Sequence, residues 1–70
     1  MKKVTYISIL CRAINDVTRA IRREAEMVAR LKEDGRTADA EYAQRHLVAP
    51  LEAELETLKT LYTIETGTDY

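Results

Sequence analysis

The chain has 70 residues and a net charge of −1, with 33% charged and 46% hydrophobic residues but only two glycines and one proline. This length limits it to one domain, residues 1–70, with a small core. A single cysteine and a single histidine exclude an internal disulfide and a Cys/His zinc site, and no apolar run is long enough to cross a bilayer. The composition predicts an all-α protein that needs no metal or cofactor, makes no membrane contact and is located in the cytoplasm.

The first half of the sequence carries a heptad pattern, in which apolar side chains recur at alternating steps of three and four residues. Glu24 is the one polar residue in this seam. Gly35, just after the last seam residue, is in a position suited to ending a helix. The pattern predicts a helix over about residues 5–34 and a turn over 34–37. The apolar seam positions are Ile7, Leu10, Ile14, Val17, Ile21, Val28 and Leu31.

The second half predicts a second helix over about residues 38–65, with Thr37 as its N-cap and Gly67 at its end. Its seam contains an irregular step beside Pro50, so the helix is expected to kink or break there. Residues 66–70 are expected to be a frayed tail. The seam residues are Ala40, Ala43, Leu47, Leu51, Leu55, Leu58 and Tyr62, flanked by Val48 and Leu61.

Pairing the two seams about a turn near Arg36 matches apolar to apolar in four consecutive layers, which predicts an antiparallel helical hairpin. Glu24 then falls level with Val48, close to Arg45 and His46. A carboxylate on a seam is costly unless it is paired, so these polar residues are expected to specify which bundle forms. An acid–base pair of Glu24 and His46 is the alternative, but the sequence offers no nucleophile, metal site or phosphate-binding loop beside it. We therefore expect no enzymatic activity, with a minimal all-helical enzyme as the remote alternative.

The positions that flank the seam of the first helix are also small or apolar, whereas a two-stranded coiled coil carries charges there. The flanking e positions are Cys11, Thr18 and Ala25, and the g positions are Ala13, Ala20 and Met27. Such a stripe is wider than one partner helix covers. It predicts a homodimer of hairpins forming a four-helix bundle; a foreign protein partner, or a three-helix monomer broken at Pro50, would also cover the stripe.

Charge is divided between the two halves. Residues 1–32 carry eight Lys/Arg and three acidic residues, whereas residues 33–70 carry three and nine. The arms are expected to attract each other, with a row of arginines available to an unidentified protein or, alternatively, to nucleic acid. The candidate partner-binding residues are Arg12, Arg19, Arg22, Arg23, Arg30, Tyr6 and Tyr42.

In length, turn position and basic first arm, though in no sequence motif, the chain is similar to the Rop-type RNA-binding hairpin dimers. That likeness implies an RNA- or DNA-binding dimer that uses the arginines of the first helix. The sequence itself favours a small interaction or regulatory module, such as an accessory or inhibitor protein of a phage or mobile element, that acts by macromolecular binding.

Overall fold

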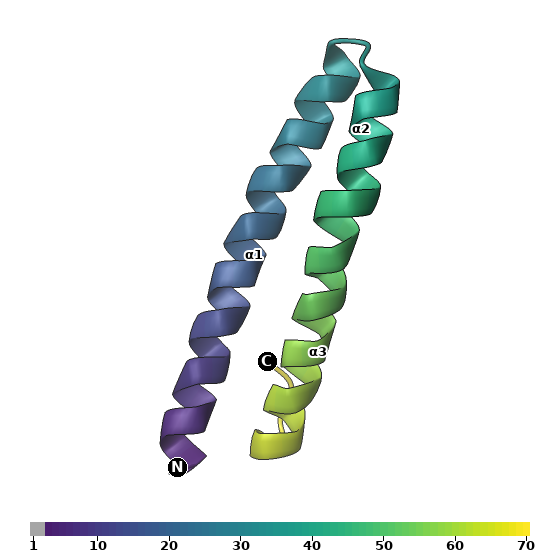
Figure 1. Cartoon of the computed structure of the whole chain (residues 1–70). Coiled ribbons are helices and arrows are strands. Elements are labelled where there is room, and N and C mark those ends of the chain that lie inside the picture. The colour runs from purple at the N-terminus through teal and green to yellow at the C-terminus, as the bar shows by residue number, and fades with distance from the viewer. Residues whose placement is uncertain (1–2) are drawn as a thin grey trace.

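The chain forms two long antiparallel helical arms joined by one tight turn (Figure 1). The computed structural model describes residues 3–70, with side chains described from Val4 onward. The first arm is α1, Lys3–Glu33, and the second is a continuous run of α2, Thr37–Ala43, η1, Gln44–Val48, and α3, Ala49–Thr66. Within these residues the protein is all-helical, and no helix has both the length and the apolar character that crossing a membrane requires.

The turn between the arms depends on Gly35. This glycine has φ +76°, a left-handed conformation that side chains with a Cβ rarely adopt. The amide of Gly35 donates to the carbonyl of Lys32 at 3.1 Å, and that of Arg36 donates to the carbonyl of Leu31 at 2.8 Å. These two hydrogen bonds are the Schellman pattern, which satisfies the free carbonyls at the end of α1.

The second arm starts at Thr37, its predicted cap, one residue earlier than expected. Thr37 is the first helical residue, and Arg36 occupies the N-cap position without a side-chain capping bond. The Arg36 guanidinium instead pairs with Asp39, its Nη2 lying 2.6 Å from Oδ2. Asp39 lies in the first turn, where a negative charge is favoured by the helix dipole.

The irregular step beside Pro50 is accommodated by a π-helical turn. Pro50 has no amide hydrogen, and its ring would crowd the carbonyl of His46 in a regular α-helix. The chain widens just before it, so that the amide of Ala49 donates to the carbonyl of Gln44, five residues back. The second arm therefore continues through the proline as one helical run. It does not break at Pro50 to form the third helix of a three-helix monomer.

This wide turn moves the seam by one residue. The sequence pattern predicts Leu47 on the seam and Val48 on its flank, whereas Leu47 is 41% exposed and Val48 is buried, at 3%. The prediction for Leu47 is wrong because a π-helical turn holds one extra residue. With Val48 on the seam, the steps from Val48 through Leu51, Leu55 and Leu58 alternate regularly between three and four.

The buried core is small and lies mainly in α1 and near the turn. Ile14, at 1% exposure, is its largest fully buried side chain, and no residue of the eighteen in α3 is buried. Near the turn, Leu31 packs against a cluster of Val28, Ala40, Ala43 and Val48. The buried residues of the hairpin are Leu10, Ile14, Val17, Val28, Ala40, Ala43 and Val48.

The last residues differ from the expected frayed tail. Gly67, with φ +76°, ends α3, and the chain then turns back toward α1. The Tyr70 hydroxyl donates to Oδ1 of Asn15 at 2.9 Å, and its ring meets that of Tyr62 edge to face at 5.1 Å. The tail is therefore tied to both arms.

Candidate interaction surface

The predicted seam residues lie between the two arms, but they are covered unequally. Six of them are buried, namely Leu10, Ile14, Val17, Val28, Ala40 and Ala43, whereas Tyr62 is half-buried and Leu47 is exposed. The others stay half-buried: Ile7, Ile21, Leu31, Leu51, Leu55 and Leu58. A two-helix hairpin thus leaves a large part of its own seam in contact with water.

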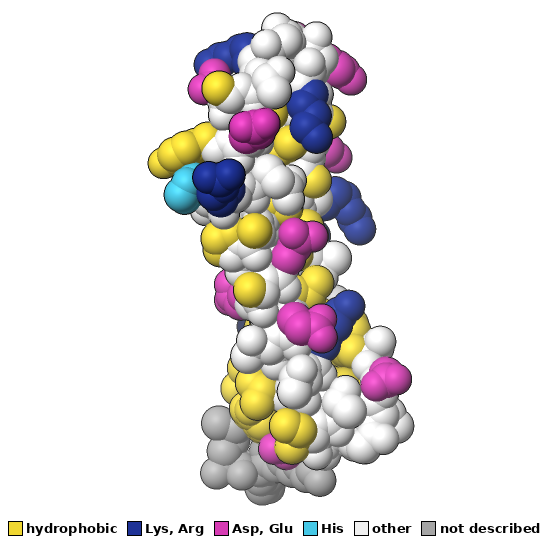
Figure 2. Space-filling model, turned by 90° about the vertical axis from the view of Figure 1, so that its right-hand side faces the viewer, with side chains coloured by type: hydrophobic (Ala, Val, Ile, Leu, Met, Phe, Trp, Pro, Cys, Tyr) yellow, Lys and Arg dark blue, Asp and Glu magenta, His cyan; other side chains and the backbone are white. Residues whose placement is uncertain are grey.

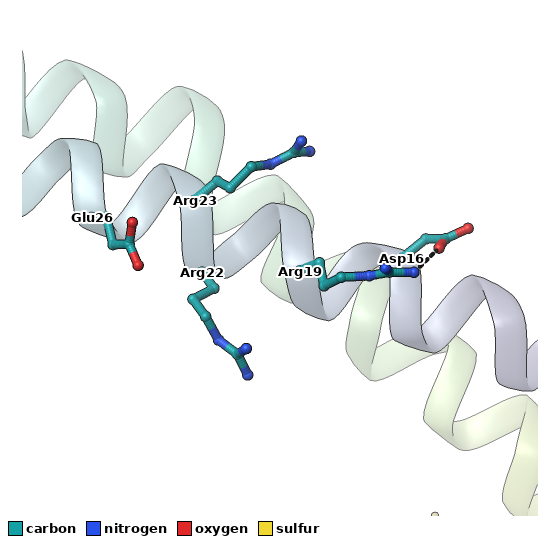
Figure 3. Close-up of a pocket in the computed structure, with 5 residues that line it drawn as sticks. All are labelled: Asp16, Arg19, Arg22, Arg23 and Glu26. Atoms are coloured by element: carbon teal, nitrogen blue, oxygen red, sulfur yellow. Dashed lines mark hydrogen bonds and ion pairs between the residues drawn. The ribbon is translucent and has the colours of Figure 1, made fainter.

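The arginines of α1 lie on its outer side and point in different directions. Arg22 and Arg23 diverge from neighbouring positions, and Arg19 turns along the helix to pair with Asp16 (Figure 3). The Arg19 Nη2 to Asp16 Oδ1 distance is 2.9 Å, and both side chains remain well exposed. Together with Glu26 these residues line a shallow, open depression. Arg12 and Arg30, also exposed, lie beyond its two ends.

The ion pairs of the described residues are both local. Arg19–Asp16 and Arg36–Asp39 each join residues three apart within one arm. The expected attraction between a basic first arm and an acidic second arm is therefore not expressed as ion pairs between α1 and α3. Such exposed pairs contribute little to stability, so the remaining exposed charges are available to another molecule.

The polar residues predicted at the seam are not bonded to one another. Glu24 is half-buried and makes no hydrogen bond or ion pair within residues 4–70, whereas Arg45 and His46 are exposed. The His46 ring packs on Tyr42 instead, with ring centroids 4.4 Å apart. The structure therefore does not assemble Glu24 and His46 into an acid–base pair.

The two candidate tyrosines differ in environment. Tyr6 is half-buried near the open end of the hairpin. Tyr42 is 66% exposed and, with its neighbour His46, borders a shallow depression on the outer side of α2. In the space-filling view the histidine (cyan) protrudes from one edge of the second arm, beside hydrophobic side chains (Figure 2).

Several exposed apolar residues were missed by the sequence pattern. Val4 is 75% exposed, Ile9 51% and Ile64 70%, and all three lie outside the heptad seam. On a helical wheel, Ile9 and Ile64 both border the g rows of their helices, whereas Val4 lies in the e row on the opposite side of α1. Scattered exposed apolar residues are ordinary on protein surfaces. The informative feature is therefore that Ile9 and Ile64 lie on the same side of the hairpin, not the number of such residues.

In the part of the chain with described side chains, no three His, Cys, Asp or Glu residues come close enough to hold a metal ion. Comparison with protein-family models, curated proteins and solved structures found no match. Any account of function therefore depends on the surface of the hairpin itself.

Proposed function

We propose that this protein is a small non-enzymatic binding module that works as a homodimer of hairpins, a four-helix bundle. The observation that carries the proposal is the absence of any buried residue in α3. Its apolar side chains Leu51, Leu55, Leu58, Leu61 and Tyr62 are only half-buried. Covering the exposed half of one such side chain stabilises the protein by about 1 kcal/mol. A second copy that covers several of them would therefore stabilise the hairpin.

A binding role also agrees with the form of the surface. The depressions on the described surface are shallow. In the depression on α1, the only bond between titratable side chains is the exposed ion pair of Arg19 and Asp16. Enzyme sites are concave and bring their reactive groups within hydrogen-bonding reach of one another. The outer arginines of α1 project away from the seam, and in a bundle they would remain free to contact an acidic surface of a partner protein.

The mass of the protein in solution tests the dimer. Sedimentation equilibrium over a range of concentrations should give twice the 8.0 kDa mass of the chain, with dissociation accompanied by loss of helical signal. A folded species of 8.0 kDa that persists at high concentration would refute the dimer.

The partner class is tested by reversing charge on the outer side of α1. The double variant Arg12→Glu and Arg22→Glu should keep the mass and helicity of the dimer but lose binding to labelled poly-glutamate, the probe for an acidic protein surface. If the unchanged protein instead binds duplex RNA or DNA with an affinity that falls steeply with salt, the module is a nucleic-acid binder.

A further inference from the structure

The hairpin has two long flanks, one on each side of its seam, and they differ in chemistry. In an antiparallel pair of helices the g rows of both helices lie on one side and the e rows on the other. The g rows form what we call the open flank: Tyr6, Ala13, Ala20 and Met27 of α1 with Leu47, Glu54 and Leu61 of the second arm. The e rows form the tail flank: Val4, Cys11, Thr18 and Ala25 of α1 with Glu52, Lys59 and Thr66 of α3.

The π-helical turn contributes to the open flank. Because η1 holds one extra residue, Leu47 moves off the seam and into the same row as Leu61. Ile9 and Ile64, both exposed, border this flank on its outer edges. Hydrophobic side chains (yellow) are accordingly exposed along the left edge of the second arm in Figure 2. The open flank is therefore the more apolar of the two.

The C-terminal tail covers part of the other flank. Tyr70 bonds to Asn15, a residue next to the e row of α1, and Thr66 of the e row bonds to Thr68 as the chain turns back. The tail flank is thus already occupied near the open end of the hairpin, whereas the open flank has no cover from the described residues. A second copy meets less obstruction on the open flank.

The size of the flank suits a second copy. The hairpin measures 49 Å by 18 Å by 14 Å, so one broad face presents roughly 900 Å². Two such faces in contact would bury about 1,800 Å² in total, which is the size of a standard protein interface.

Charge decides how the two copies are oriented. A two-fold axis parallel to the helices places α1 against α3 of the second copy and brings both turns to the same end. An axis across the helices places α1 against α1 and separates the turns. The first arm is basic, since residues 1–32 carry eight Lys/Arg and three acidic residues, whereas residues 33–70, which include the second arm, carry three and nine. The first arrangement lays the basic arm of one copy against the acidic arm of the other, whereas the second lays two basic arms together.

We propose that two copies of this chain dock through their open flanks, with α1 of each copy against α3 of the other and both turns at the same end. This inference rests on the dimer proposed above and adds its contact face and its polarity. In this arrangement Met27 of one copy and Leu47 of the other meet near the turns.

Two matched variants of α1 test the contact face. Met27→Glu places a charge on the open flank, and Ala25→Glu places the same charge on the tail flank two residues away; both positions are exposed in the single hairpin. Sedimentation equilibrium should show at least a tenfold weaker dimer for Met27→Glu and little change for Ala25→Glu, with both variants equally helical at concentrations at which they are dimeric. A dimer weakened by Ala25→Glu and unaffected by Met27→Glu would overturn the proposed face.

The polarity is tested by a distance between the two turns. Asp34→Cys in a Cys11→Ala background provides one spin-labelling site per copy, beside Gly35. Turns at the same end should give a label–label distance well below the 49 Å length of the hairpin, whereas turns at opposite ends give a distance close to that length.

Charge reversal provides an independent reading. Arg23→Glu or Glu54→Arg alone should weaken the dimer, because each reduces the opposite charge of the two arms that face each other; strengthening by Arg23→Glu would instead indicate α1 against α1. A monomeric mass for the unchanged protein refutes the dimer itself. A dimer with separated turns refutes only its proposed polarity.

Discussion

Ile14 offers the sharpest test of where the hairpin draws its stability. Its side chain is 1% exposed, whereas that of Ile64, on the outer side of α3, is 70% exposed. Replacing either by alanine removes three carbon atoms, worth about 0.8 kcal/mol each when fully buried. For Ile14→Ala the transfer loss is therefore about 2.4 kcal/mol, and the cavity left behind raises the total to about 3–4 kcal/mol. For Ile64→Ala the loss is about 0.7 kcal/mol, largely offset by the better helix propensity of alanine.

The assay is urea denaturation followed by far-ultraviolet circular dichroism, at one fixed protein concentration for all variants. Ile14→Ala should lower the midpoint strongly, because about 3 kcal/mol is a large fraction of the stability of a small domain. Ile64→Ala should leave the midpoint nearly unchanged. Equal losses at the two positions would show that the two side chains are similarly buried in solution, and would refute the seam described here.

Three further variants test separate features. Glu24→Leu should raise the free energy of unfolding by up to about 1 kcal/mol, since the carboxylate is half-buried without a partner; a large loss in the same urea titration would reveal an essential bond to a second copy. Deleting Arg45 together with Pro50→Ala should give an uninterrupted α-helix at equal or higher stability, whereas the deletion alone should cost about 3 kcal/mol because Pro50 would then lie inside a regular helix. Tyr70→Phe should lower stability by no more than about 1 kcal/mol by removing the exposed bond to Asn15, and identical thermal midpoints for the two proteins would show that the tail is unattached in solution.

The hairpin itself was accessible from the sequence because heptad spacing and Gly35 are local signals. The all-helical prediction is confirmed, while the bundle remains a proposal. The π-helical turn was not predicted, since an irregular step beside a proline fits a kink, a break or an inserted residue equally well in one dimension. Only the three-dimensional arrangement shows that Val48, rather than Leu47, lies on the seam.

The candidate site was less accessible from the sequence than the fold. Residue types place arginines on α1, but only the structure shows that Arg19 turns along the helix to pair with Asp16. The bond from Tyr70 to Asn15 joins residues fifty-five apart, and no periodic pattern reports such a contact. The asymmetry between the two flanks follows from that bond and from the extra residue in η1, neither of which composition reveals.

The turn at Gly35 also influences the order in which contacts between the two arms form during folding. Residues beside the turn are close in sequence, so bringing them into contact closes a short loop, whereas contact at the far end closes a loop of almost the whole chain. Folding is thus favoured to zip from the turn toward the termini. Local unfolding should accordingly start at the open end of the hairpin. Amide hydrogen exchange should therefore be fastest where the arms end and slowest around Val28, Ala40 and Ala43, the cluster beside the turn.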